Sequence, residues 1–422
     1  MADRIVLAYS GGLDTSVAVA WLRQKMGYEV IAVAADVGQG GDWDALIARA
    51  RAAGAVEAMV VDCTDEYARD FLAPALRANA LYEGRYPLVS ALSRPVIVKH
   101  LVEAARRFGA VAVAHGCTGK GNDQVRFEVS TASLAPDLDI IAPVRSWGMT
   151  REQCVDYAAA EGIPIETSKG SPYSIDDNLW GRAIECGVLE DPWASPPEDV
   201  YELTAITATE PTEFVISFEE GVPVALGGVP MGLADIIGEV GARVGSYGFG
   251  RLDMVENRRV GIKSREVYEC PASLALIMAH RDLESVTLER DLAHEKMRLE
   301  PRYADLVYDG QWFSPLRSAI DAFMGDANRR VTGEVRIVCE RPGTRPDGTP
   351  TPGNVSVGGR RSPYSLYDHD LATYGEGDSF RHEDSEGFVR LWGLGLKTWA
   401  ARAEGSASKG SASKDSASKG SA

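Results

Sequence analysis

The chain has 422 residues, of which 45% are hydrophobic and 25% charged, and its formal net charge is −17 at pH 7. This length indicates more than one domain, and the composition is that of ordinary globular proteins. The negative charge disfavours a nucleic-acid partner, because binding through phosphate groups usually needs a basic face. An anionic small substrate would need a locally arranged site, since the overall field repels it.

The N-terminal residues and the cysteines indicate a cytoplasmic protein without a membrane partner. The sequence begins MADRIVLAYSGG, which lacks the apolar core of a signal peptide, and no apolar stretch is long enough to span a bilayer. The cysteines form no C-x-x-C pair; they are Cys63, Cys117, Cys154, Cys186, Cys270 and Cys339. This scatter fits free thiols in a reducing compartment better than a disulfide framework.

The first half of the chain alternates short apolar runs with runs of helical spacing. RIVLAYS, EVIAVAADVG, VEAMVVD and VAVAHG have the pattern of buried parallel strands. Between them, TSVAVAWLRQKM, DALIARARAA and the segment around IVKHLVEAARRF have the pattern of helices. In TREQ, Thr150 and Gln153 form a predicted capping box for a helix through Ala160. We therefore expect residues 1–168 to form a doubly wound parallel sheet with helices on both faces.

The order of strand-like and helical runs then changes, which predicts a second domain over residues 169–362. Strand-like runs such as EFVISFEEGVPVAL and GEVRIVCE mix with helical runs such as SLALIMAHRDLESVTLERDLAHEKMRLE. This mixture is typical of an α+β domain with an antiparallel component. The fold class is therefore predicted to be α/β, with an α+β domain after the parallel sheet.

Residues 363–403 are predicted to form a C-terminal arm with an amphipathic helix, for which Ser385 is a candidate N-cap. The apolar face of this helix comprises Phe388, Leu391, Trp392, Leu396 and Trp399. The helix either packs on its own domain or docks on a neighbouring subunit; two tryptophans so near a terminus favour docking, because they need a large apolar surface. Residues 404–422 repeat small polar units with nothing to bury, which predicts disorder.

The junction AYSGGLDTS, from Ala8 to Ser16, lies where the first predicted strand ends and a helix begins. Unpaired N–H groups and the helix dipole at such a junction favour phosphate. The glycines permit close backbone approach and the hydroxyl groups are donors, at Gly11, Gly12, Ser10, Thr15 and Ser16. Asp14 is a candidate ligand for a Mg²⁺ ion bound to the phosphates. The spacing is not that of a Walker loop, and the alternative is an ordinary glycine turn with Thr15 as helix cap.

A second polar stretch, HGCTGKGNDQVRFE, follows another predicted strand and suits a zwitterionic ligand. Arg126 can pair bidentately with a carboxylate. Asp123 can accept hydrogen bonds from an ammonium group, and Thr118 and Asn122 can fix the orientation of the ligand. The alternative is a polar surface loop with a capping network.

These motifs carry a resemblance to known enzymes. S-G-G-x-D-[ST]-S resembles the PP-loop of the ATP pyrophosphatases, a superfamily with an adenine nucleotide alpha hydrolase-like domain that cleaves ATP between the α and β phosphates. AYSGGLDTS, ADVGQ, RYPL, GCTGKGNDQVRFE, SPYSIDDNLWGR and VENRRVGIKSREVYE, in this order, closely resemble the argininosuccinate synthase family from about residue 4 to about residue 402. That family joins citrulline to aspartate using ATP, and releases AMP and pyrophosphate.

The resemblance implies roles for individual residues. ATP would be bound by Ala8, Tyr9, Ser10, Gly11, Gly12, Leu13, Asp14, Thr15, Ser16, Ala35 and Gly116. Aspartate would be bound by Thr118, Asn122 and Asp123, and citrulline by Tyr86, Asn122, Arg126, Ser174, Glu256 and Tyr268. The catalytic set would be Asp14, Ser10, Thr15, Ser16 and Asp123. Mg²⁺ with the ATP phosphates and a homotetramer with an oligomerisation helix at the C-terminus are also implied.

Two positions depart from the family pattern, because Ala91 and Ala183 stand where relatives often carry serine. Each change removes one hydroxyl contact to citrulline, worth about 0.5–1.5 kcal/mol. The sequence disfavours two other functions. A tRNA-modifying PP-loop enzyme is disfavoured by the scattered cysteines and the negative charge, and a non-catalytic ATP-binding regulator by the retained aspartate and citrulline positions.

Overall fold

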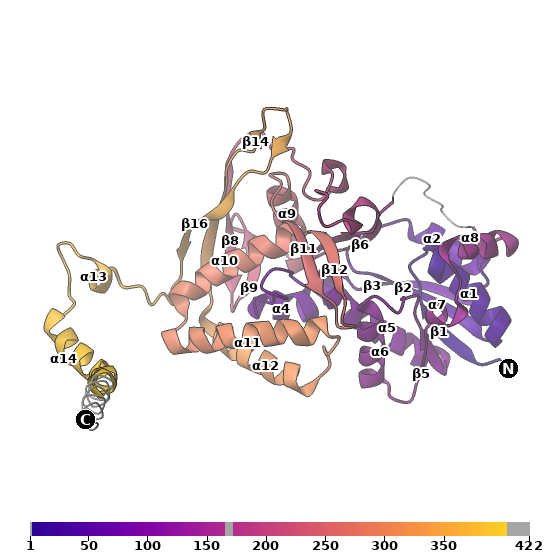
Figure 1. The fold of residues 1–422 in the computed structure, drawn as a ribbon, viewed down its shortest axis with the longest axis horizontal. Coiled ribbons are helices and arrows are strands. Elements are labelled where there is room, and N and C mark those ends of the chain that lie inside the picture. Colours follow the sequence, from indigo (N-terminus) through magenta and orange to yellow (C-terminus); the bar gives the residue numbers. More distant parts are fainter. Residues whose placement is uncertain (1, 165–171, 403–422) are drawn as a thin grey trace, which may run out of the picture. The chain divides into compact units, whose positions relative to one another are not determined.

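The structure is a computed structural model that describes residues 2–164 and 172–402 (Figure 1). It divides into two compact units, Met1–Leu366 and Tyr367–Ala422. The predicted boundary between residues 168 and 169 and the predicted disorder of 404–422 lie outside the described residues. The first unit contains both predicted sheet regions.

A five-stranded parallel sheet forms the N-terminal part of the first unit, as predicted. Its order is β3-β2-β1-β4-β5, and every neighbouring pair is parallel. The strands are β1 (Arg4–Ala8), β2 (Glu29–Asp36), β3 (Glu57–Asp62), β4 (Ala112–Ala114) and β5 (Asp139–Ile141). The first four coincide with the apolar runs of the sequence, whereas β5 was not predicted.

Helices cover both faces of this sheet. Ile5 and Leu7 of β1 pack with residues of α1 (Leu13–Met26) and α8 (Arg151–Ala160), whereas Val6 packs with the other face. This alternation follows from the two-residue period of a strand. The other helices are α2 (Trp43–Ala52), α3 (Thr64–Glu66), the π-helix η1 (Tyr67–Leu72), α4 (Ala73–Arg77), α5 (Val89–Phe108), α6 (Asp123–Leu134) and α7 (Pro143–Trp147), of which α5 and α6 contribute to the core on the Val6 side.

The strand order reverses between β1 and β4, because β2 and β3 lie on one side of β1 and β4 and β5 on the other. In open parallel sheets, ligands bind outside the carboxyl ends of the strands at such a reversal. The two segments that leave the sheet there are the Ala8–Ser16 junction after β1 and the polar stretch after β4. The topology therefore brings the two sequence motifs to one edge of the sheet.

The rest of the first unit is built on antiparallel sheets, which confirms the predicted change of architecture. A four-stranded sheet has the order β11-β12-β7-β6, and a five-stranded sheet the order β10-β9-β8-β13-β16. The strands are β6 (Ser174–Asn178), β7 (Gly181–Glu185), β8 (Thr212–Glu219), β9 (Val222–Leu226), β10 (Val229–Pro230), β11 (Arg251–Asn257), β12 (Lys263–Glu269), β13 (Gly333–Cys339), the hairpin β14 (Gly343–Thr344) and β15 (Pro350–Thr351), and β16 (Val355–Arg361).

Helices pack around these sheets, with one interruption in the long helical run of the sequence. The run is divided into two helices, because Glu289 accepts hydrogen bonds from the Asp291 and Leu292 N–H groups and so caps the start of a second helix. The helices are α9 (Leu233–Gly245), α10 (Pro271–Thr287), α11 (Arg290–Tyr308) and α12 (Pro315–Ala327), with the 3₁₀ turns η2 (Gly187–Glu190), η3 (Glu198–Val200) and η4 (Asn328–Arg330).

The second unit contains α13 (His369–Ala372) and α14 (His382–Trp392), and residues 394–402 are also helical. The prediction of Ser385 as N-cap is wrong, because α14 begins at His382 and its cap position is Arg381. Acidic residues in the first turn, Glu383 and Asp384, favour this earlier start through the helix dipole.

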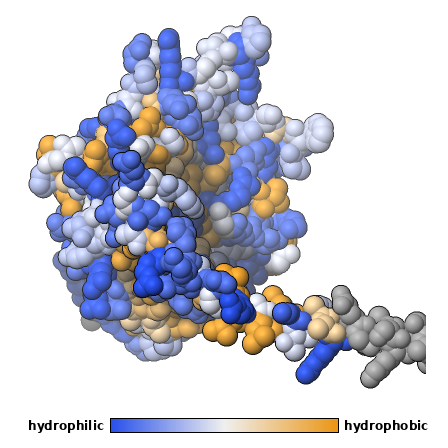
Figure 2. All heavy atoms as spheres, turned by 90° about the vertical axis from the view of Figure 1, so that its left-hand side faces the viewer, coloured by the Kyte–Doolittle hydropathy of each residue, from blue (hydrophilic) through white to orange (hydrophobic). Residues whose placement is uncertain are grey.

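Two further expectations concern the state of the cysteines and the absence of a membrane-spanning stretch. All six cysteines are free thiols, as predicted. Within residues 2–164 and 172–402 no helix combines the length and the apolar character needed to cross a membrane. Figure 2 shows one face of the molecule, on which hydrophilic side chains predominate and hydrophobic ones gather in small groups.

Replacing Thr150 by alanine is expected to lower the free energy of unfolding by about 1 kcal/mol, because the capping box at the start of α8 would be lost. The Thr150 Oγ1 accepts from the Gln153 N–H at 3.3 Å, and the Gln153 side chain accepts from the Thr150 N–H at 2.8 Å. Urea unfolding of this variant, with Glu152→Gln as the neighbouring control, measures the difference. Equal unfolding curves for Thr150→Ala and the unaltered chain would contradict the expectation.

Candidate active site

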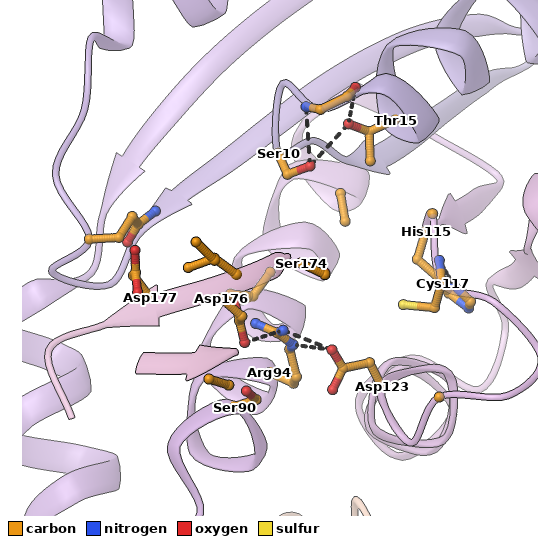
Figure 3. A pocket seen from close by; sticks show the side chains of 18 of the residues that line it. Ser10, Thr15, Ser90, Arg94, His115, Cys117, Asp123, Ser174, Asp176 and Asp177 are labelled. Carbon is orange, nitrogen blue, oxygen red and sulfur yellow. Dashed lines mark hydrogen bonds and ion pairs between the residues drawn. The ribbon is translucent and has the colours of Figure 1, made fainter. Parts of the chain in front are cut away.

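An open pocket of about 980 Å³ lies at the carboxyl ends of β1 and β4 and extends to β6, β7, β11 and β12. Figure 3 shows it from close by, with Ser10 and Thr15 on one side and Arg94, Asp123 and Asp176 on the other. The pocket thus joins the parallel-sheet region to the four-stranded antiparallel sheet. All predicted site residues except Gly11 and Ser16 line it.

The phosphate-loop candidate forms the turn between β1 and α1. The N-cap of α1 is Gly12, and no side chain caps it, so the first-turn N–H groups are left for a ligand. The alternative with Thr15 as helix cap is therefore wrong; the Thr15 hydroxyl lies 3.1 Å from the Ser10 hydroxyl instead. Gly11 has φ +75°, and a Cβ there would lie 3.2 Å from Arg49 Nη1, so both the conformation and the space favour glycine.

Ser16 and Asp14 differ in their access to the pocket. Ser16 is fully buried, and its hydroxyl lies 3.0 Å from the Tyr9 hydroxyl, which makes it a support for the loop. Asp14 lines the pocket; burial raises the pKa of its carboxyl group, and the positive charge of Arg151 opposes this shift. A desolvated carboxylate beside a phosphate loop fits a Mg²⁺ ion that takes its other ligands from phosphates and water. Among the described residues, no group of three or more histidine, cysteine or acidic side chains can hold a metal by itself.

The start of the second polar stretch packs closely on the phosphate loop. A Cβ at Gly116 would lie 2.9 Å from Thr15 Cγ2, so only glycine allows this approach. His115 is buried; its Nδ1 accepts from the Cys117 N–H at 3.2 Å, which leaves a proton on Nε2, 3.2 Å from Glu128. This histidine therefore holds the loop in shape. Ala35, on β2, lines the same side of the pocket.

Asp123 stands between two arginines. It accepts from Arg126 Nη1 at 2.8 Å, and from Arg94 Nε and Nη2 at 3.0 and 2.7 Å. Burial alone would raise the pKa of Asp123, but the two guanidinium groups lower it to about 2. Arg94 Nη2 also donates to Asp176 at 2.7 Å, so Arg94 bridges α5, α6 and β6 (Figure 3).

Arg94 and Asp176 were not among the predicted site residues. The only signal for Arg94 is a charged side chain within the otherwise uncharged run SALSRPVIV. Asp176 lies in SPYSIDDN, a stretch that carries the family resemblance, but its pairing depends on the packing of β6 against α5.

Arg126 and Asn122 are fixed by the last residue of α11. Arg126 is buried; its Nε donates to the Tyr308 carbonyl at 3.1 Å, and its guanidinium lies 5.0 Å from the Tyr308 ring centre. Asn122 Nδ2 lies 2.6 Å from the Tyr308 hydroxyl, and its Oδ1 accepts from the Arg259 N–H at 2.9 Å. Tyr308 is a further residue that the sequence did not single out.

Aromatic residues hold Glu256 at the far end of the pocket. The hydroxyl groups of Tyr268 and Tyr308 donate to its two carboxylate oxygens at 2.8 and 2.7 Å. Tyr86 stacks on Tyr268, with ring centres 4.2 Å apart, and its hydroxyl accepts from the Ser90 N–H at 3.0 Å. An anionic carboxylate lined by aromatic rings suits a ligand ammonium group.

Side chains of β6 and β7 complete the predicted amino-acid side of the pocket. Ser174, the first residue of β6, lies opposite Glu185 of β7. Of the two positions that depart from the family pattern, Ala183 lines the pocket, whereas Ala91 is fully buried and does not. Thr118 also lines the pocket, on the loop before α6.

A third arginine in the pocket is shared by two acids. Arg258 Nη2 donates to Glu185 at 2.9 Å and also pairs with Glu266. Burial, with the neighbouring carboxylates of Glu185 and Glu256, raises the pKa of Glu266 to about 8, although Arg258 opposes this shift. The folded chain therefore holds a proton on Glu266 in a pH range in which the unfolded chain has lost it.

Glu266→Gln is expected to remove a pH dependence of stability. Because the pKa of Glu266 is raised from 4.5 to about 8, the unfolded state binds fewer protons in this window, and the free energy of unfolding falls as pH rises. We expect the fall between pH 5 and 8 to be smaller in the variant by roughly 1–3 kcal/mol. Urea unfolding across this range measures it, with the exposed Glu295→Gln as control. Parallel profiles for Glu266→Gln and the unaltered chain would refute the assignment.

Comparisons with known proteins identify a family over most of the chain. Residues 4–164 match the family described as Arginosuccinate synthase N-terminal HUP domain, and residues 173–399 match Arginosuccinate synthase C-terminal domain. Among solved structures, a predicted subunit of tRNA methyltransferase from Methanocaldococcus jannaschii is similar at 16% identity, over 37% of this chain and 76% of that chain, with a TM-score of 0.27.

Proposed function

Because the chain belongs to the argininosuccinate synthase family, we propose that it ligates citrulline to aspartate at the expense of ATP, forming argininosuccinate, AMP and pyrophosphate. The observation that carries the proposal is that all the residues expected to bind ATP, aspartate and citrulline, except Gly11 and Ser16, line one pocket. The phosphate loop lies at one side, and the Asp123–Arg126 pair and Glu256 lie at the other.

In the first step, the ureido oxygen of citrulline attacks the α-phosphorus of ATP. A bond forms between these atoms while the bond from the α-phosphorus to the bridging oxygen breaks, and the electron pair stays on the departing pyrophosphate. The product is citrullyl-AMP. The hydroxyl groups of Ser10 and Thr15 and the uncapped N–H groups of α1 would stabilise the growing charge on pyrophosphate. Phosphate-bound Mg²⁺, with Asp14 as a candidate ligand, would supply further charge neutralisation.

In the second step, the aspartate amine attacks the ureido carbon. The carbon–nitrogen bond forms, the attacking nitrogen releases a proton to solvent, the carbon–oxygen bond breaks, and AMP leaves with the former ureido oxygen. Asp123 would orient the amine, with Thr118 and Asn122 beside it. With its pKa lowered to about 2, Asp123 is a poor proton acceptor, so its proposed role is binding and orientation.

Citrulline would be held at its amino-acid end. Arg126 would pair with its carboxylate, helped by Tyr86 and Ser174, while Glu256 and Tyr268 would face its ammonium group. The proposed catalysis depends on the positioning of the substrates and on charge stabilisation, and neither step needs a side-chain nucleophile. Burial raises the pKa of Cys117, the cysteine that lines the pocket, to a level at which it is not a thiolate near neutral pH.

A homotetramer and a cytoplasmic location belong to the same proposal. On and after α14, apolar side chains are exposed, among them Leu391, Trp392 and Trp399. Exposed apolar surface of this kind suits a contact between subunits. Light scattering of the full chain and of a chain ending at Leu366 tests this part, since only the full chain is expected to form tetramers.

Pyrophosphate release tests the proposed reaction. ATP and Mg²⁺ are incubated with citrulline and aspartate, singly and together. Stoichiometric release of AMP and pyrophosphate is expected only with both amino acids. Release without amino acids would indicate hydrolysis of ATP to AMP and pyrophosphate, and no release in any combination would favour the ATP-binding regulator.

A further inference from the structure

Four arginines line the pocket, and three of them are already occupied. Arg94 and Arg126 pair with Asp123, and Arg258 pairs with Glu185 and Glu266. Arg151 is the fourth. Within residues 2–164 and 172–402, no hydrogen bond or ion pair reaches its guanidinium. Among the described residues it is therefore the lining guanidinium whose donors are not already engaged by a side chain of the protein.

Arg151 lies on the phosphate side of the pocket. It is the first residue of α8, and its charge acts on Asp14 of the phosphate loop. The capping box of Thr150 and Gln153 fixes the backbone at this point, and Cys154 and Ala158 of α8 pack in one core cluster with Val17 and Leu22 of α1. The guanidinium is thus carried by an element packed on the phosphate-binding helix.

The position of Arg151 is unfavourable for the helix itself. A cation in the first turn faces the positive end of the helix dipole, where acidic residues are preferred. The adjacent Glu152 follows this preference, whereas Arg151 does not. The residue therefore contributes nothing evident to α8, while its side chain reaches the pocket.

The charge balance of the pocket gives such a cation a function. Its lining contains four arginines and eight acidic side chains: Asp14, Asp42, Asp123, Asp176, Asp177, Glu185, Glu256 and Glu266. The whole chain carries −17 as well. The phosphate loop offers only neutral donors, so a polyphosphate there needs positive charge from elsewhere.

We propose that Arg151 binds the pyrophosphate group of ATP and stabilises it as it leaves. This inference rests on the proposed function. When the bond between the α-phosphorus and the bridging oxygen breaks, its electron pair adds negative charge to pyrophosphate. The Arg151 guanidinium can donate two hydrogen bonds to phosphate oxygens. It therefore binds the departing pyrophosphate in the transition state more strongly than it binds the same group of ATP in the ground state.

The test compares Arg151→Gln and Arg151→Lys in the full chain. Arg151→Gln is expected to weaken inhibition by pyrophosphate, and to lower kcat/KM for ATP, by about tenfold to a hundredfold, the range of a lost charge-assisted contact. The KM values for citrulline and aspartate are expected to stay within about twofold, because their contacts lie elsewhere. Arg151→Lys keeps a point charge and is expected to fall in between. Arg107→Gln, an exposed position at the end of α5, is the control for loss of one charge.

Two kinetic outcomes overturn the inference. An unchanged pyrophosphate inhibition constant in Arg151→Gln would remove Arg151 from the site. If pyrophosphate inhibition is weakened equally in Arg107→Gln, the effect of Arg151→Gln comes from overall charge. If the unaltered chain forms no argininosuccinate, the proposed function fails separately. Calorimetric binding of magnesium pyrophosphate then decides: weaker binding by Arg151→Gln upholds the inference, whereas equal binding, or none by the unaltered chain, overturns it.

Discussion

Replacing Asp123 by asparagine is expected to reduce kcat/KM for aspartate by about a hundredfold, while ATP binding survives. The substitution would remove the carboxylate that attracts the aspartate ammonium group. It would also leave the buried Arg126 without its carboxylate partner, and Arg94 with Asp176 alone. Because removing one partner of a buried ion pair leaves an uncompensated charge, we expect a loss of about 3–5 kcal/mol in unfolding free energy.

Acid unfolding separates the structural part of this effect from the catalytic part. The pKa of Asp123 is lowered from 3.8 to about 2, so its pairing stabilises the fold above pH 4 and is lost as pH falls toward 2. The asparagine variant is expected to lack this portion of the pH dependence. Asp199→Asn, which removes an exposed carboxylate, is the control. Unchanged aspartate kinetics in Asp123→Asn would exclude Asp123 from the site.

Arg126→Leu is expected to raise the KM for citrulline by about tenfold to a hundredfold, with a smaller effect on the KM for ATP. The guanidinium is fixed by Asp123, by the Tyr308 carbonyl and by the Tyr308 ring, so it presents a preorganised donor to a carboxylate. Arg126→Lys keeps the charge but not the planar fork, and it is expected to recover only part of the loss.

The measurement for Arg126 is a steady-state titration of each substrate at saturating levels of the other two. Arg106→Leu, at an exposed position on α5, controls for the loss of a positive charge. A citrulline KM that is unaltered in Arg126→Leu would remove this residue from the proposed citrulline site. A loss shared equally by all three substrates would indicate general damage to the fold.

Strand and helix patterns in the sequence predict the parallel sheet and its helices well, because buried strands are continuous apolar runs. β5 escapes this pattern, since only Asp139–Ile141 pair with β4. The start of α14 was also misplaced. Ser385 has the chemistry of a cap, but acidic residues before it already continue the helix toward its N-terminus.

The site divides into residues that motifs reveal and residues that only packing reveals. The phosphate loop and the stretch after β4 are local, so their spacing is visible in the sequence. Arg94 and Tyr308 depend on contacts across 29 and 186 positions, to Asp123 and Asn122 respectively. Arg151 lies inside the predicted capping box TREQ. Because that motif already explains the start of a helix, nothing in it indicates that Arg151 lines the pocket.

In the proposed reaction, adenylation in this pocket activates the ureido oxygen of citrulline. The test is to incubate citrulline labelled with ¹⁸O in the ureido group with ATP, Mg²⁺, aspartate and the full chain. We expect the label to appear in the phosphate of AMP, because the carbon–oxygen bond breaks in the second step. Label in pyrophosphate, or AMP formed without label, would contradict it.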